Sequence, residues 1–129
     1  MGKKILIVED DANLLYGLQA KLRVAGFEVM TDEGADQPEV LEKIKALKPD
    51  YIILDLILPR LDGFELLSEI KSEQEISKIP VFIFTNLSDS DSRQKGKNLG
   101  ADFYLIKTDF NLDEFVEKFK KIIGNLEKI

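Results

Sequence analysis

Short apolar runs recur along the chain, each separated from the next by a segment with helical spacing. Four of these runs are almost wholly apolar and rich in β-branched or aromatic residues, which is typical of strands covered on both faces. They occupy residues 5–8, 51–54, 81–84 and 103–106. A fifth run, residues 27–31, places Glu28 between Phe27 and Val29, as expected for a strand at a sheet edge. The pattern therefore predicts five strands.

Apolar residues three and four positions apart predict helices between the strands and after the last one. The stripes are Leu14, Leu15, Leu18, Leu22 and Ala25; Val40, Leu41, Ile44 and Leu47; Phe64, Leu67 and Ile70; and Leu112, Phe115, Val116, Phe119, Ile122, Ile123 and Leu126. Gly26 follows the first stripe as a C-cap candidate. The last helix should begin at a capping box of Asn111 and Glu114, with Phe110 stapled onto Phe115.

The segment 88–99, between the fourth and fifth strands, is much more polar than the other helical segments. Leu99 is its only large apolar residue, so the sequence predicts a weak helix there. Elements that move during function are drawn from the less stable parts of a protein. A moving element and a helix that is poorly optimised for no functional reason explain this composition equally well.

Strict alternation of strands and helices with short connections predicts parallel strands joined by right-handed crossovers. The fold class that follows is a doubly wound α/β sheet of five parallel strands. With 129 residues, 44% of them hydrophobic, the chain has room for one domain, residues 1–129, with a core of its own.

Composition excludes several kinds of chemistry. The chain contains no Cys and no His, so thiolate and imidazole chemistry are absent, and any phosphoryl chemistry falls to carboxylates, hydroxyls or lysines. A net charge of −6 disfavours binding to nucleic acid or to an anionic membrane surface. The apolar runs are too short to span a bilayer, and the absence of a signal-like segment favours a cytoplasmic location.

Polar residues stand where each of four predicted strands ends. The first strand is followed by Glu9 and Asp10, the third by Asp55, the fourth by Thr85 and the fifth by Lys107. Each residue alone has an ordinary interpretation, as a turn residue, a helix cap or a charge that protects a sheet edge. Together they are more informative, because ligands of open parallel sheets bind at the carboxyl ends of the strands.

If the strand order is 2-1-3-4-5, the ends of strands one and three are neighbours, and Glu9, Asp10 and Asp55 converge. Three carboxylates without His or Cys form a hard oxygen site suited to Mg²⁺. Such an ion would relieve their repulsion and admit a phosphoryl group. Asp55 could then act as the nucleophile, with Lys107 and Thr85 stabilising the phosphoryl oxygens.

At this point the chain resembles the receiver domain of two-component response regulators, the chemotaxis receivers in particular. The resemblance covers essentially the whole chain and is carried by four segments with matching spacing. These are KILIVEDD at 4–11, ILDLILPRLDG at 53–63, Thr85 after VFIF at 81–84, and GADFYLIK at 100–107. The resemblance implies a flavodoxin-like (βα)5 fold with the strand order 2-1-3-4-5.

The resemblance also implies roles for individual residues. Asp55 would be the phosphoacceptor, and Lys107 would bind the phosphate. Glu9, Asp10 and Asp55 would form the Mg²⁺ site together with the backbone carbonyl of Ile57. Thr85 and Tyr104 would form the switch pair, in which the hydroxyl turns towards the phosphoryl group and the ring moves inward.

The expected partners also come from the resemblance. A histidine kinase or a phosphotransfer protein would donate the phosphoryl group. Phosphorylation would change the surface of the fourth helix, fifth strand and fifth helix, where a downstream effector protein or a second copy would bind. Such a receiver is a regulator rather than an enzyme, although it takes part in its own Mg²⁺-dependent phosphotransfer and slow autodephosphorylation. One helix follows the last strand, so we expect a stand-alone receiver or a piece of a longer regulator.

The sequence departs from the family pattern at two positions. Thr108 replaces the proline that commonly follows the lysine in a cis peptide, and Asn86 replaces a small residue after Thr85. A cis bond before a non-proline residue costs about 2.5–4 kcal/mol, so we expect either a trans bond with a shifted loop or a strained bond.

Ile57 and Leu87 stand where polar residues often orient the hydrolytic water, and their apolar side chains predict a long-lived phosphoaspartate.

Three other functions compete with this interpretation. A flavodoxin-like cofactor binder is disfavoured, because Glu9 and Asp10 would repel the cofactor phosphate. A phosphatase that forms an aspartyl-phosphate usually has a second Asp two residues after its nucleophile, where this chain has Ile57. The serious alternative is a phosphorylation-independent adaptor with the receiver fold, since Thr108 and Asn86 could reflect a degraded site.

Overall fold

The computed structural model describes residues 2–128 and contains one parallel sheet of five strands in the order β2-β1-β3-β4-β5. The strands are β1 (Lys4–Val8), β2 (Glu28–Asp32), β3 (Tyr51–Leu54), β4 (Val81–Thr85) and β5 (Phe103–Ile106). The order predicted for a flavodoxin-like fold is therefore confirmed. β1 pairs with both β2 and β3, so the first and third strands end side by side.

In the part of the chain that the structure describes, five α-helices alternate with the strands, and each begins at a polar cap. They are α1 (Ala12–Val24), α2 (Gln37–Leu47), α3 (Gly63–Ser72), α4 (Ser90–Asn98) and α5 (Leu112–Leu126). The side chains of Asp11, Asp36, Asp62, Asp89 and Asn111 accept backbone hydrogen bonds at the five N-termini. The predicted capping box of α5 is present in full, and the Phe110 ring meets the Phe115 ring edge-on with 6.3 Å between centroids.

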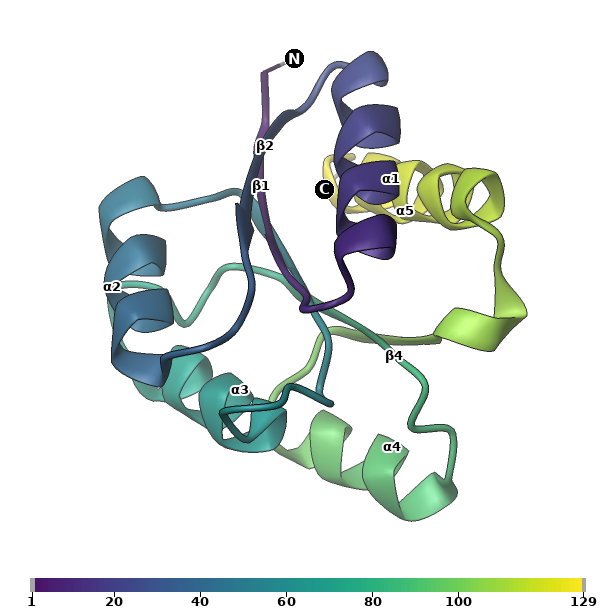
Figure 1. Cartoon of the computed structure of the whole chain (residues 1–129). Coiled ribbons are helices and arrows are strands. Elements are labelled where there is room, and N and C mark those ends of the chain that lie inside the picture. The colour runs from purple at the N-terminus through teal and green to yellow at the C-terminus, as the bar shows by residue number, and fades with distance from the viewer. Residues whose placement is uncertain (1, 129) are drawn as a thin grey trace.

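The sheet lies between helices on both of its faces (Figure 1). It thereby separates two apolar layers. Alternate residues of a strand point to opposite faces. In β1, Leu6 and Val8 pack with α2 and α3, whereas Ile5 and Ile7 pack with α1 and α5. The second layer is rich in aromatic rings from β4 and α5, which contact one another in stacked or tilted pairs. Because both faces of the sheet are covered, the central strands are apolar along their whole length.

The sequence-based boundaries agree with the structure to within a residue or so. β2 begins at Glu28 rather than Phe27, and the C-cap of α1 is Ala25, with Gly26 next in the left-handed region at φ 101°. Segment 88–99 contains α4, in which Gly96 is the only buried residue, so this helix packs little surface against the core. The weakness expected of this helix stays a prediction. Within residues 2–128, no helix is both long enough and apolar enough to cross a membrane.

Candidate functional site

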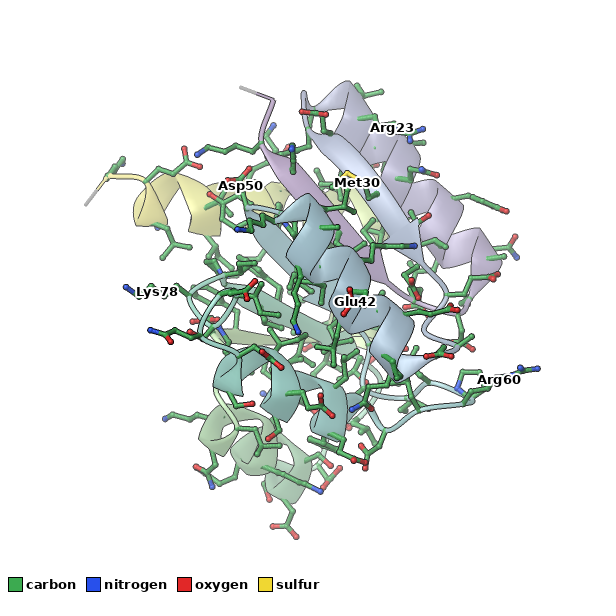
Figure 2. The ribbon with its side chains drawn as sticks, turned by 90° about the vertical axis from the view of Figure 1, so that its left-hand side faces the viewer. Arg23, Met30, Glu42, Asp50, Arg60 and Lys78 are labelled. Carbon is green, nitrogen blue, oxygen red and sulfur yellow. The ribbon has the colours of Figure 1, made fainter. Side chains whose placement is uncertain are left out.

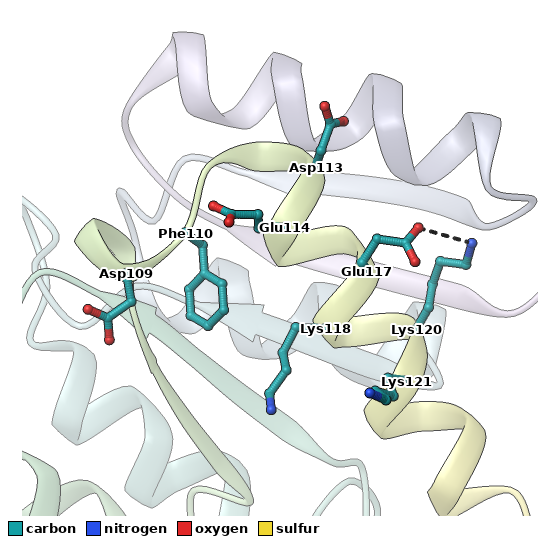
Figure 3. Close-up of a pocket in the computed structure, with 8 residues that line it drawn as sticks. All are labelled: Asp109, Phe110, Asp113, Glu114, Glu117, Lys118, Lys120 and Lys121. Atoms are coloured by element: carbon teal, nitrogen blue, oxygen red, sulfur yellow. Dashed lines mark ion pairs between the residues drawn. The ribbon is translucent and has the colours of Figure 1, made fainter.

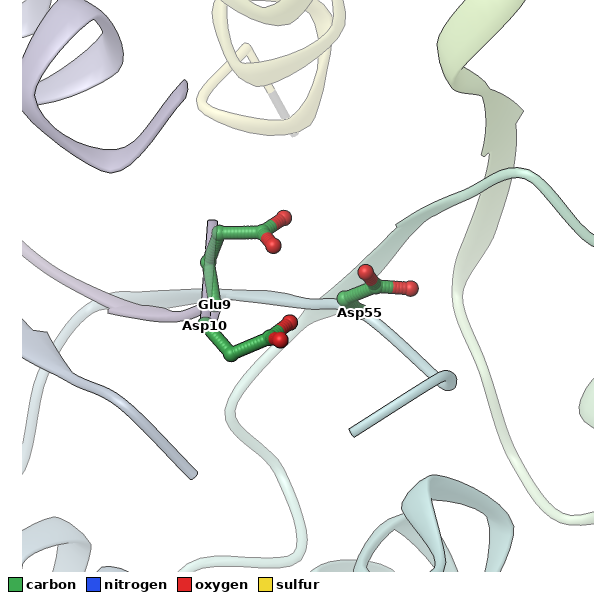
Figure 4. Close-up of side chains that lie close together, drawn as sticks. All are labelled: Glu9, Asp10 and Asp55. Carbon is green, nitrogen blue, oxygen red and sulfur yellow. The ribbon is translucent and has the colours of Figure 1, made fainter. Parts of the chain in front are cut away.

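Three carboxylates meet at the carboxyl ends of β1 and β3 (Figure 4). Val8 pairs with Leu54, and the Asp55 amide donates to the Val8 carbonyl over 3.1 Å, which brings the two strand ends together. One carboxylate oxygen from each of Glu9, Asp10 and Asp55 lies within 4.8 Å of the other two. Parallel pairing of neighbouring strands thus places side chains far apart in the sequence at one point.

The three acids differ in their exposure to solvent. Glu9 is 2% exposed and Asp55 is 5% exposed, whereas Asp10 is open to solvent. Burial raises the pKa of Glu9 above its ordinary value of 4.5, although hydrogen bonds from the Lys107 ammonium and the Asp11 amide act in the opposite direction. Two of the three acids are therefore buried, and solvent reaches the cluster at Asp10.

Lys107 neutralises part of this negative charge. Its Nζ lies 2.7 Å from an oxygen of Glu9 and 2.7 Å from an oxygen of Asp55. Burial alone would lower the pKa of Lys107, but hydrogen bonds to Asp55 and Glu9 outweigh this effect and raise the pKa above 10.5. The four groups then carry a formal charge of −2, from three carboxylates and one ammonium.

Lys107 reaches the cluster although Thr108 follows it. Residues Lys107–Asp109 form one turn of 3₁₀ helix directly after β5, and all peptide bonds among residues 2–128 are trans. Of the two possibilities raised by the missing proline, the trans bond is the one observed. The loop still directs the ammonium at Asp55.

The loop after Asp55 folds back on itself and holds the Asp55 carboxylate. The Ile57 amide donates to Asp55 Oδ1 over 3.1 Å, and Ile57 forms an isolated antiparallel bridge with Asp62. Gly63 packs directly on the Leu56 backbone, with no room for a Cβ. The Ile57 side chain is 51% exposed at the rim of the site. Arg60, at the tip of the loop, points away from the molecule (Figure 2).

Thr85 and Tyr104 are linked through the backbone of Leu87. Thr85 is fully buried, and its Oγ1 accepts a hydrogen bond of 3.4 Å from the Leu87 amide. The Leu87 carbonyl accepts a hydrogen bond of 2.7 Å from the Tyr104 hydroxyl. This connection was not foreseen from the sequence, because it uses main-chain atoms whose positions depend on how β4 and β5 pair.

The donor set suits a hard divalent cation. Carboxylate oxygens are the protein ligands that Mg²⁺ prefers, and Mg²⁺ usually keeps several waters. Asp10 opens the cluster to solvent, so water has access to complete the coordination shell. Asp55 is a carboxylate with the Lys107 ammonium beside it and the buried Thr85 hydroxyl at the end of the neighbouring strand β4. Such a set of groups is chemically able to accept and hold a phosphoryl group.

A shallow hollow also lies on the outer side of α5, lined by Phe110 and by acidic and basic side chains (Figure 3). Its lining includes none of the three clustered carboxylates. The charges around it are mixed, and Glu117 and Lys120 are 3.7 Å apart. This hollow does not coincide with the chemistry at the strand ends, and we assign no ligand to it.

The comparison with known families agrees with this geometry. A model of the response regulator receiver domain matches residues 5–120. The chain belongs to this family. Receiver domains are components of two-component signalling systems, and the residues matched include the acidic cluster, Thr85, Tyr104 and Lys107.

Individual relatives show the same relationship. The chain is 34% identical to the alkaline phosphatase synthesis transcriptional regulatory protein PhoP of Bacillus subtilis, over 98% of this chain and 51% of PhoP. It spans about half the length of the curated relatives it matches.

Three solved structures of receivers are also similar to this chain. The chemotaxis response regulator CheY4 of Vibrio cholerae has a TM-score of 0.83 at 28% identity, covering 95% of this chain and 99% of CheY4. The Mn²⁺-bound form of response regulator Rcp1 has a TM-score of 0.76 at 28% identity, covering 89% and 88% of the two chains. The phosphorylated cyanobacterial phytochrome response regulator RcpA has a TM-score of 0.77 at 30% identity, covering 95% and 91%.

Proposed function

We propose that this chain is a receiver switched by phosphorylation, with Asp55 as the phosphoacceptor. The observation that carries the proposal is the position of Asp55: its carboxylate is buried, close to two further acids and 2.7 Å from the Lys107 ammonium. A phosphorylated relative of the same fold, RcpA, supports it. Residues 1–129 would act as one domain, in the cytoplasm, and as a regulator rather than an enzyme.

Glu9, Asp10 and Asp55, with the Ile57 carbonyl, would hold a Mg²⁺ ion. The Mn²⁺-bound form of Rcp1 supports a divalent cation in this family. When bound, the ion would supply positive charge that offsets the carboxylates and a phosphoryl group together. Asp10 is the most exposed of the three acids, so its removal should weaken ion binding with the least effect on folding.

In the proposed transfer, an Asp55 oxygen forms a bond to phosphorus while the bond from phosphorus to the donor histidine nitrogen breaks. The imidazole nitrogen keeps the electron pair of that bond. Lys107, already beside Asp55, would stay close to the phosphoryl oxygens and stabilise their charge. Because this chain has no His, the donor must be another molecule: a histidine kinase or a phosphotransfer protein, with small acyl phosphates as substitutes.

The phosphoryl group would then change the surface formed by α4, β5 and α5. It adds roughly −1.5 to −2 charges at Asp55. Thr85 would turn its hydroxyl towards that charge, and Tyr104 would respond through Leu87, to which both residues are hydrogen bonded. The partner on this surface would be a downstream effector protein or a second copy of the chain, and not nucleic acid or membrane.

The phosphoryl group should be long-lived. Ile57 lines the rim of the site with an apolar side chain, and Leu87 is half-buried beside Thr85. Neither side chain is able to orient an attacking water by hydrogen bonding. Replacing both with polar residues, Ile57→Asn and Leu87→Glu, should therefore speed up dephosphorylation, and unchanged rates in the double variant would remove the basis for this expectation.

The deciding experiment is incubation with Mg²⁺ and acetyl phosphate, with the mass of the intact protein as the readout. We expect a single phosphoryl addition that is lost in Asp55→Ala and retained in Asp11→Asn. The Asp11 side chain caps α1, which makes it a matched carboxylate outside the proposed ligand set. An adaptor would not be modified, a phosphatase would turn the reagent over, and modification of Asp55→Ala would indicate another acceptor.

A further inference from the structure

Helix α4 has a glycine in its interior, at a position where the backbone conformation does not require one. Gly96 lies inside the helix, and its backbone is not in the left-handed region. A glycine in a helix interior destabilises the helix relative to alanine. Gly96 is nevertheless the one residue of α4 that is buried, so packing rather than backbone conformation accounts for it.

The space that a side chain at Gly96 would need is occupied by the ring of Tyr104. A Cβ at this position would lie 3.0 Å from Cε2 and 3.1 Å from Cδ2 of that ring. Contacts this short are tighter than ordinary packing, so the ring would have to move. Gly124 in α5 offers a direct comparison, because a Cβ there meets no atom of residues 2–128 within 4 Å.

The same ring contacts two further groups, Leu87 and Arg93, and Leu87 connects it to the proposed phosphorylation site. Its hydroxyl donates to the Leu87 carbonyl over 2.7 Å, and the Leu87 amide donates to Thr85. The Arg93 guanidinium of α4 lies over the ring, 5.9 Å from its centroid. A shift of the ring therefore changes contacts with both α4 and the end of β4.

We propose that Gly96 is a positioning residue for Tyr104: the missing side chain forms the recess in α4 that receives the ring. The residue at this position thereby sets the balance between a ring packed on α4 and a ring turned away from it. The second part of the proposal, that this balance sets the response to a phosphoryl group at Asp55, rests on the proposed function.

A double-mutant cycle on thermal stability tests the packing. Gly124→Ala should raise the melting temperature, because alanine is the better helix former and has room. With Tyr104 present, Gly96→Ala should raise it less or lower it, by roughly 2 °C or more relative to Gly124→Ala. In a Tyr104→Ala background, the two glycine substitutions should become equivalent. Equal gains from Gly96→Ala with and without the ring would overturn the proposal.

A second measurement reads the ring directly and needs no Tyr104 substitution. In protein labelled with 3-fluorotyrosine, the three ¹⁹F resonances include two internal references, Tyr16 at 66% exposure and Tyr51 at 5%. Gly96→Ala should increase the solvent accessibility of the Tyr104 resonance and leave the references unchanged. An unmoved Tyr104 resonance would contradict the recess.

Adding Mg²⁺ and beryllofluoride to the same samples tests the link to Asp55. The wild-type Tyr104 resonance should move, and in Gly96→Ala the size of that movement should change. If it moves equally in both proteins, the regulatory part of the proposal is wrong. If the wild-type resonance does not move although acetyl phosphate modifies Asp55, Tyr104 is not coupled to the site. If Asp55 is not modified at all, the proposed function itself has failed.

Discussion

Among residues 2–128, Lys107 is the one cation paired with the two buried carboxylates of Glu9 and Asp55, and its replacement by methionine isolates that role. Methionine keeps an unbranched apolar side chain, with sulfur in place of Cδ, and lacks the ammonium. The Lys107 side chain is 15% exposed, and its Nζ is 2.7 Å from both Glu9 and Asp55. The substitution therefore leaves two acids buried without the group that pairs them.

The expected loss of stability follows from this geometry. Removing one partner of a buried ion pair typically costs about 3–5 kcal/mol, because the remaining charge stays desolvated. The repulsion between carboxylate oxygens no more than 4.8 Å apart is worth at least about 3.5 kcal/mol at an effective dielectric constant of about 20. We expect the free energy of unfolding to fall by about 3 kcal/mol at pH 7 without divalent ions, which most domains of this size survive.

Urea denaturation followed by circular dichroism measures this loss. Lys118→Met is the matched control, since Lys118 is exposed and forms no ion pair among residues 2–128. The control should change the free energy of unfolding by no more than about 0.5 kcal/mol. If the cluster binds Mg²⁺ as proposed, saturating Mg²⁺ should stabilise Lys107→Met more than wild type, because the charge at the cluster changes from −2 to −3.

Two results would refute this reasoning. If Lys107→Met and wild type unfold at the same urea concentration without metal, the buried acids do not need their cation. If Mg²⁺ raises both midpoints equally, the ion does not bind beside Lys107.

Three further predictions concern Tyr51 at the start of β3, the N-cap of α5 and a glycine within α5. Burial and the neighbouring Glu127 raise the pKa of Tyr51. Wild type should therefore be more stable than Tyr51→Phe below pH 10, and this difference should shrink as the pH rises further. A difference in melting temperature that does not depend on pH would argue against this. Asn111→Ala should cost about 1 kcal/mol in urea denaturation, because it breaks the capping box with Glu114. Gly124→Ala should stabilise the chain by about 0.5–1 kcal/mol, and a lower melting temperature would show that the site is not open.

Local features of the sequence were sufficient to predict the elements. Short apolar runs and apolar residues three to four positions apart depend only on neighbours a few residues away, and strand and helix positions follow from them to within a residue or so. The Asn111 and Glu114 capping box is local in the same sense. The weak packing of α4 could also be predicted, because a segment without apolar residues has little to bury.

The candidate site could be predicted only on a condition. The positions of Glu9, Asp10 and Asp55 directly after predicted strands made them candidates. They converge because β1 lies beside β3, and that strand order came from a family resemblance rather than from the residues themselves. Lys107 was identified as a candidate, yet its simultaneous pairing with two acids depends on a loop whose course the missing proline left open.

The tertiary structure alone decided the contacts between backbone and ring. The Leu87 amide donates to Thr85 and the Leu87 carbonyl accepts from Tyr104. A pattern of side chains along the sequence does not predict where such main-chain groups lie. Gly96 was visible in the sequence as a glycine within a polar helix, but the ring that packs on it belongs to Tyr104 of β5, and the helical pattern gives no sign of that contact. Periodicity specifies which face of an element is apolar, whereas the pairing of β4 with β5 brings residues distant in the chain into contact.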